Sequence, residues 1–183
     1  SAASSGGGGS GASGRSGKLV DPYIKDAWVF VDVDGSGSYE PSITGEMIAQ
    51  TDDNGNFTFS SVASIGATIR MLTSGIHLGI TYDADIVRYV DGSSDLTMSP
   101  LTTLLANGMS AEAIVYLLSN YAGITIDAAD VRSDPMSGLD VSTLPNDQAL
   151  AKIRGAIAVY SLMKVLDDAN VDMDGFDLAS LEA

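Results

Sequence analysis

A change in the spacing of apolar residues near Ser99 constrains the fold more than any other feature of the chain. Before Ser99, short alternating segments are separated by turn signals such as "DDNGN" and "DGSSD", which is typical of strands. After Ser99, apolar residues recur at helical spacing, as in "SAEAIVYLLSNYAG". The sequence therefore predicts an α+β chain in which an antiparallel Greek-key β-sandwich is followed by a small α-helical domain.

The expected elements follow from this reading. Strands are expected within residues 18–20, 27–33, 57–62, 67–72, 77–82, 85–90 and 95–98. Ser99 and Pro100 predict the start of one helix, and Ser110 and Gly123 predict the two ends of the next. Residues 147–167 predict the longest helix, with these side chains buried on one face: Ile153, Ile157, Tyr160 and Met163.

The first 17 residues, "SAASSGGGGSGASGRSG", carry no apolar pattern and are typical of a Gly/Ser linker. We therefore divide the chain into a tether or exchanged segment at 1–17, a β-sandwich domain at 18–98 and an α-helical domain at 99–183. Serines in the first segment are possible acceptors of O-linked glycans.

The charge of the chain excludes some classes of partner. Its 183 residues carry a formal net charge of −15, and 24 of them are Asp or Glu. Nucleic acid is not expected as a partner, because binding it requires a basic surface. No stretch approaches the roughly 20 apolar residues of a membrane span. The chain has no cysteine, so disulfides and thiolate metal sites are ruled out.

The segment "DVDGSGSYEP" at residues 32–41 directly follows the apolar run "AWVFV". Counted from Asp32, this segment places Asp34 and Ser36 at positions 3 and 5 and a glycine at position 6, as in the first half of an EF-hand calcium loop. Position 12, where an EF-hand has a bidentate glutamate, is Ile43. The alternative is a polar β-turn closed by side-chain caps.

The wider stretch from 18 to about 75 resembles the prealbumin-like Greek-key modules of bacterial surface proteins, which include collagen-adhesin B-type modules and calcium-binding B repeats. An apolar strand, an Asp-rich turn, the Glu40–Pro41 pair and "TDDNGNF" carry the resemblance. "MSPLTTLLANG" is similar to a segment that follows such modules in some Gram-negative surface lipoproteins. The resemblance implies calcium as the cofactor, with these ligands: Asp32, Asp34, Ser36, Glu40 and Asp52.

The segment "DANVDMDGFD" at 168–177 follows the expected long helix and is a second calcium candidate. Asn170, Asp172 and Asp174 precede a glycine in the D-x-D-x-D-G pattern, with Asn in the first place. The alternative is an acidic, frayed C-terminal segment.

No catalytic motif stands out. His77 is the only histidine and lies in an expected strand, so it is interpreted as structural. Trp28 lies within "AWVFV" and is expected in the core. A nucleophile elbow, a Walker loop and a zinc-protease motif are all absent from the sequence. We therefore expect a non-enzymatic protein, and keep a glycosidase-like enzyme only as a third alternative.

Two non-enzymatic interpretations of function precede that third alternative. The first is a calcium-stabilised structural subunit of a bacterial surface filament or layer, which assembles with other copies of itself through its N-terminal segment. The second is a monomeric calcium-binding adhesin or stalk module of a surface lipoprotein. Both place the protein outside the cell or on its surface.

Overall fold

The computed structural model describes residues 14–21, 23–82 and 85–134, together with helical backbone at Arg154, Ala158 and Ser161. These three isolated positions fall within the expected helix at 147–167. The expected burial of Ile153, Ile157, Tyr160 and Met163 lies outside the described residues. So does the second calcium candidate at Asn170, Asp172 and Asp174.

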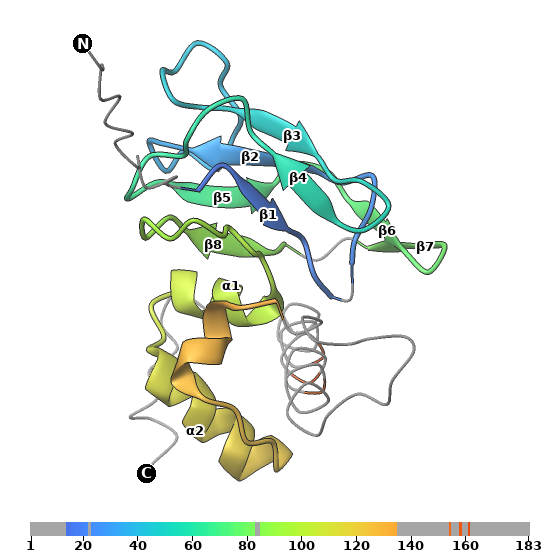
Figure 1. Cartoon of the computed structure of the whole chain (residues 1–183), viewed down its shortest axis with the longest axis vertical. Coiled ribbons are helices and arrows are strands. Elements are labelled where there is room, and N and C mark those ends of the chain that lie inside the picture. Colours follow the sequence, from blue (N-terminus) through green and yellow to red (C-terminus); the bar gives the residue numbers. More distant parts are fainter. Residues whose placement is uncertain are drawn as a thin grey trace, which may run out of the picture.

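The fold is α+β, with antiparallel strands in the first half and helices in the second (Figure 1). The strands are β1 (Ser16–Lys18), β2 (Trp28–Asp32), β3 (Ile48–Gln50), β4 (Asn56–Thr58), β5 (Thr68–Met71), β6 (Gly75–His77), β7 (Ile80–Tyr82) and β8 (Val87–Tyr89). They form a four-stranded sheet in the order β3-β2-β5-β8 and two ribbons, β1-β4 and β6-β7.

The core of the β half lies between the four-stranded sheet and the β1-β4 ribbon. Val29, Val31 and Ile69 alternate onto the inner face of the sheet and are fully buried. They belong to one apolar cluster with Phe57 and Phe59, whose rings lie 5.4 Å apart. The other face of the same sheet therefore remains available for polar side chains.

The helices are α1 (Pro100–Ala106), α2 (Ala111–Ala122) and the 3₁₀ helix η1 (Ala128–Arg132). The Ser99 side chain accepts a hydrogen bond from the Thr102 N–H in a capping box, and the Ser110 side chain accepts one from the Ala113 N–H at the start of α2. Gly123 ends α2 in the left-handed conformation. Both expected helix starts and the expected end of α2 are thus confirmed.

The first helix is joined to the sheet by side-chain hydrogen bonds. The Thr102 hydroxyl donates to the Val87 carbonyl at 2.9 Å, and the Val87 N–H donates to the Thr103 hydroxyl at 2.9 Å. Both threonines are buried, and α1 lies alongside β8 (Figure 1). Strand β8 therefore has β5 on one side and a helix on the other.

Several strand expectations are corrected by the structure. The segment 77–82 is not one strand, because Leu78 and Gly79 both adopt positive φ and turn the chain between β6 and β7. Strand β3 was not expected at all. Trp28 is 37% exposed rather than buried, because it starts β2 on the outer face of the sheet.

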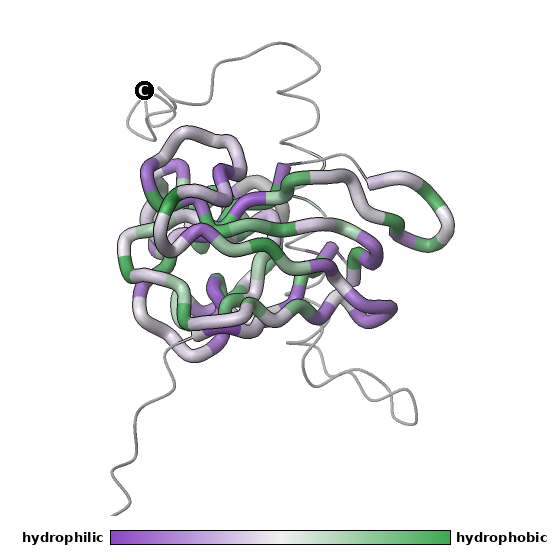
Figure 2. Tube along the Cα trace, turned by 90° about the horizontal axis from the view of Figure 1, so that it is seen from above, coloured by the Kyte–Doolittle hydropathy of each residue, from purple (hydrophilic) through white to green (hydrophobic). Residues whose placement is uncertain are grey.

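The described chain is hydrophobic along its inner strands and hydrophilic in many of its turns (Figure 2). One exception is the β6-β7 hairpin, where Leu78 and Ile80 are strongly exposed. Among the described residues, no helix has the length and apolar character needed to cross a membrane.

Candidate metal centre

The outer face of the four-stranded sheet presents a buried carboxylate at the end of β2. Trp28, Phe30 and Asp32 alternate onto this face, and the Asp32 side chain has no exposed surface. The Tyr39 ring packs edge-on against Phe30, with ring centroids 6.2 Å apart. The loop that follows β2 therefore folds back over the sheet and covers Asp32.

Three donors hold the Asp32 carboxylate in place. Oδ1 accepts the Gly35 N–H at 2.8 Å, and Oδ2 accepts the Gly37 N–H at 3.0 Å and Arg70 Nε at 2.9 Å. Burial alone would raise the pKa of Asp32, but the hydrogen bonds from Arg70 and the two N–H groups outweigh it and lower the pKa below its ordinary value. Asp32 is therefore ionised at neutral pH, as a metal ligand must be.

The loop itself is shaped by short side-chain turns. Asp34 Oδ1 accepts the Ser36 N–H at 3.0 Å, and the Ser36 hydroxyl donates to the Ser38 carbonyl at 3.2 Å. Gly37 has φ +75°, a conformation that a side chain would strain, so glycine is needed at the position expected from the EF-hand-like spacing. This conformation directs the Gly37 N–H toward Asp32.

A third carboxylate reaches this loop from the next strand. Strands β2 and β3 pair antiparallel, with Phe30 opposite Ile48, so the residues that precede β3 lie beside the end of β2. The Val31 N–H donates to the Met47 carbonyl at 2.9 Å, which continues the pairing toward Glu46. Glu46 is 8% exposed, and its Oε2 accepts the Glu40 N–H at 2.6 Å.

Asp32, Asp34 and Glu46 each offer an oxygen atom, and these three atoms lie within 4.8 Å of one another. The hydrogen bonds leave part of each carboxylate available. Asp32 Oδ1 has one donor, and Asp34 Oδ2 has none among the described residues. Glu46 Oε1 is fully buried and has no hydrogen-bond partner in the part of the chain that the structure describes. A buried carboxylate oxygen without a donor is costly, and a cation would compensate it.

This cluster can hold a metal ion. Three carboxylates face one guanidinium, so the site has a net negative charge. All of its candidate ligands are oxygen atoms, which suit hard divalent cations rather than zinc or copper. Asp34 and residues 35–38 of the loop are exposed, so water and loop carbonyl groups can supply further ligands.

The structure brings together only two of the ligands that the resemblance implied. Ser36 uses its hydroxyl within the loop, and Glu40 contributes its backbone N–H to Glu46 rather than a carboxylate oxygen to the cluster. Asp52 caps its own turn and accepts hydrogen bonds from the Asn54 and Asn56 N–H groups at 2.8 and 2.9 Å.

The position of Asp52 follows from the same strand pairing that brings in Glu46. Because the pairing is antiparallel, the residues after β3 lie beside the start of β2, where the Thr51 N–H donates to the Ala27 carbonyl. Asp52 therefore belongs to the opposite end of β2 from Asp32. The short apolar run "MIA" at 47–49 was the available signal for β3 and, through it, for Glu46.

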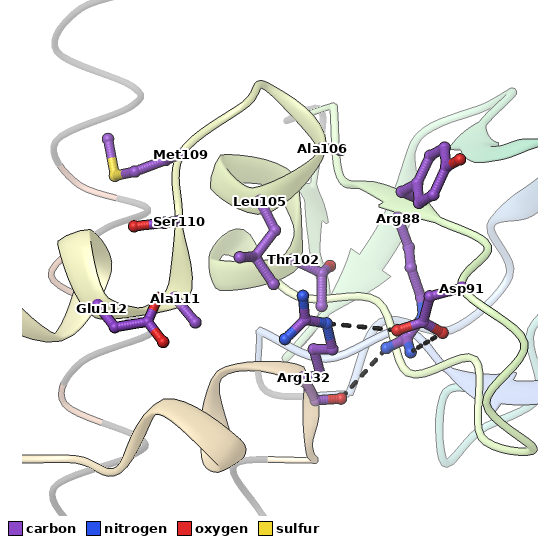
Figure 3. A pocket seen from close by; sticks show the side chains of 11 residues that line it. Arg88, Asp91, Thr102, Leu105, Ala106, Met109, Ser110, Ala111, Glu112 and Arg132 are labelled. Carbon is purple, nitrogen blue, oxygen red and sulfur yellow. Dashed lines mark hydrogen bonds and ion pairs between the residues drawn. The ribbon is translucent and has the colours of Figure 1, made fainter. Parts of the chain in front are cut away.

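A second concave site lies between β8 and the helices, with a volume of about 380 Å³ (Figure 3). Arg88 and Arg132 both point toward Asp91 there, at 3.5 and 3.3 Å. Burial would raise the pKa of Asp91, but hydrogen bonds from Ser93 and the Arg88 charge lower it. Asp91 is therefore poorly suited to donate a proton at neutral pH.

Comparisons of the chain with models of protein families, with curated proteins and with solved structures find no match. The resemblance to bacterial surface modules therefore rests on its sequence motifs, and the candidate metal centre rests on its geometry.

Proposed function

We propose that this chain is a non-enzymatic calcium-binding protein, whose β half is stabilised by calcium held between Asp32, Asp34 and Glu46. The observation that carries the proposal is at Glu46, a member of the carboxylate cluster, whose buried Oε1 has no hydrogen-bond partner among the described residues. Three carboxylates packed this closely repel one another, so a divalent cation would remove an electrostatic repulsion that destabilises the ion-free protein.

Calcium fits this arrangement better than magnesium does. Calcium accepts six to eight oxygen ligands in irregular geometry, whereas magnesium requires a near-octahedral set and releases its waters reluctantly. Asp32 ends a strand, Asp34 lies in a loop and Glu46 precedes another strand, so no single element arranges the three carboxylates in octahedral geometry. Backbone carbonyls of the loop and water would complete the coordination.

The test is thermal unfolding of chelated protein during a calcium titration. We expect the melting temperature to rise by about 2–4 °C once calcium exceeds its Kd severalfold, and further at higher calcium, because the ion binds only the folded chain. Magnesium, and sodium chloride at matched ionic strength, are the controls, since screening alone stabilises a chain with a net charge of −15. An equal rise with sodium chloride would overturn the proposal.

The same proposal places the protein at a bacterial cell surface. The motif resemblance to Greek-key surface modules supports this setting, in which a Kd of about 10⁻⁴–10⁻³ M is sufficient because extracellular calcium is abundant. The monomeric adhesin or stalk module is the simpler form of this function. It requires the calcium site but no contact between copies.

One observation favours assembly into a filament or layer as a second candidate. Strand β3 is at the edge of the four-stranded sheet and pairs only with β2 among the described residues, so its outer side can accept another strand. Residues 16–18 pair with β4 of their own chain, which leaves residues 1–13 as the segment for exchange. Thirteen extended residues span up to about 45 Å.

Deletion of residues 1–13 tests the assembly. We expect the intact chain to form polymers in calcium, seen by negative-stain microscopy and sedimentation, and the truncated chain to remain monomeric. Polymers formed equally by the truncated chain would exclude exchange through this segment. An intact chain that remains monomeric at high concentration in calcium would favour the adhesin or stalk module.

A further inference from the structure

We propose that Arg70 sets the calcium affinity of this centre: it neutralises Asp32 when no ion is bound and weakens the binding of the ion. This inference rests on the proposed calcium function and deepens it, because it assigns a role to a residue outside the ligand set. The inference predicts two opposite effects when the Arg70 charge is removed. The calcium-free protein becomes less stable, and calcium binds more tightly.

The geometry of β2 and β5 places the two charges together. Arg70 pairs opposite Phe30 on the neighbouring strand, while Asp32 pairs opposite Thr68, so Arg70 and Asp32 are diagonal neighbours on the outer face. Arg70 Nε lies 2.9 Å from Asp32 Oδ2. The Asp32 side chain is fully buried there, whereas the Arg70 side chain is 30% exposed.

Without an ion, Arg70 is the only cationic side chain among the described residues that pairs with a carboxylate of the cluster. Asp32 Oδ2 already accepts the Gly37 N–H, and the guanidinium supplies the second, charge-assisted bond. A buried carboxylate without such a partner would destabilise the folded chain. Arg70 therefore allows the loop to fold before calcium arrives.

With an ion bound, the same charge acts in the opposite direction. An ion on Asp32 Oδ1 lies on the same carboxylate as the guanidinium, so a divalent and a monovalent positive charge stand a few ångströms apart. Arg70 also shares Oδ2 with the Gly37 N–H, which disfavours bidentate coordination by Asp32. Both effects lower calcium affinity. Removal of Arg70 abolishes the charge repulsion and leaves only the Gly37 N–H on Oδ2.

The size of the effect is limited by solvent. Arg70 lines a hollow of about 370 Å³ beside the loop, together with Gly37 and Asp85, so water reaches the guanidinium. With the high effective permittivity of such a surface, we expect removal of the charge to lower the calcium Kd by about tenfold.

The experiment compares four proteins by calorimetric calcium titration and by urea unfolding in a chelator. Arg70→Gln removes the charge, and Arg70→Lys keeps it. Arg15→Gln is the matched control, because it changes net charge equally at an exposed position outside the outer face. We expect Arg70→Gln to bind calcium about tenfold more tightly and to be less stable in the chelator, while the other variants keep a Kd within about threefold of the unmodified chain.

The outcomes separate this inference from the proposed function. If the unmodified chain binds calcium but Arg70→Gln binds equally or more weakly, Arg70 has a merely structural role and the inference fails. If neither protein binds calcium, the calcium function itself fails and the inference falls with it. If Arg70→Gln folds only in the presence of calcium, its unfolding midpoint must begin to rise at a lower calcium concentration than that of the unmodified chain, and a rise that begins at the same or a higher concentration overturns the inference.

Discussion

Asp32, at the end of β2, and Glu46, just before β3, reach the same centre, with oxygen atoms within 4.8 Å of each other. The antiparallel pairing of β2 with β3 is responsible, because it sets the residues before β3 beside the end of β2. A neighbouring acid, Glu40, contributes its N–H to Glu46 Oε2 but no oxygen to the cluster. The two glutamates thus have separable roles.

Glu46→Gln should abolish the calcium-dependent rise in melting temperature. Removing one of three crowded charges should also make the calcium-free protein equally stable or more stable, because repulsion within the cluster falls. Glu40→Gln is the matched control, since it alters the expected ligand and leaves the backbone N–H in place. A loss of the calcium response in Glu40→Gln, but not in Glu46→Gln, would favour the ligand set implied by the sequence resemblance.

Asp52→Ala should reduce stability without changing calcium affinity. The Asp52 carboxylate accepts two backbone N–H groups and the Asn56 side-chain amide, so its loss should cost about 1–2 kcal/mol of unfolding free energy. Urea unfolding measures the cost, and calorimetric titration measures the affinity. A calcium Kd that weakens markedly would place Asp52 near the ion after all.

These residues show how far the sequence alone can locate the centre. Asp32 and Asp34 are predictable because their spacing and the following glycines are local features of one loop. Glu46 depends on β3, a strand of three residues without apolar/polar alternation, and on its register with β2. Asp52 was misplaced for the same reason, because the direction of pairing decides which end of β3 meets Asp32.

The α+β fold was predictable at the coarser level. The two helix starts could be predicted because the Ser99 and Ser110 side chains cap N–H groups of the following turn, which is a local interaction. The turn between β6 and β7 was missed because Leu78 adopts φ 49°, which an apolar side chain rarely does. The exposure of Trp28 depends on which face of the sheet is covered, and that is a tertiary property.

Gly17→Ala should destabilise the β half, although the sequence assigns residue 17 to a tether. An added Cβ would collide with the Leu96 carbonyl and lie 2.9 Å from the Phe57 ring. We expect a loss of about 1–3 kcal/mol in unfolding free energy. Ser16→Ala, at an exposed position of the same strand, should change stability by less than about 0.5 kcal/mol. Equal, small effects of both changes would show that β1 contributes little to folding.

Arg88→Met should be among the most damaging single changes in the β8 region. Arg88 donates to the Thr97 carbonyl at 2.8 Å, the Arg132 carbonyl at 3.2 Å and the Ser93 hydroxyl at 2.8 Å. Its side chain is 3% exposed, so we expect a loss of about 3 kcal/mol or more.

The matched control for Arg88 is Arg132→Met. The Arg132 side chain is 49% exposed, and its ion pair with Asp91 should contribute at most about 1 kcal/mol. Urea unfolding of both variants in a chelator provides the comparison. A similar, small loss in both variants would mean that Arg88 does not join the sheet to η1.

Asp21→Asn should change how stability depends on pH. Asp21 is buried and accepts the Tyr82 hydroxyl at 2.7 Å. Burial raises the pKa of Asp21 above its ordinary value of 3.8, although the Tyr82 hydrogen bond and the His77 charge oppose the rise. The folded chain therefore holds this proton more tightly than the unfolded chain does. Asparagine keeps the shape and an acceptor for Tyr82 but has no proton to lose.

The stability that Asp21 contributes is complete below pH 3.8 and is lost as pH rises through the raised pKa of the folded chain. As pH rises from 3.8 through the raised pKa, the free energy of unfolding of the unmodified protein should therefore fall relative to that of Asp21→Asn. Urea unfolding of both proteins across the window, in a chelator and at constant ionic strength, measures the difference directly. A difference that is constant with pH, or that grows in favour of the aspartate, would show that the Tyr82 hydroxyl stabilises the ionised carboxylate more than burial disfavours it.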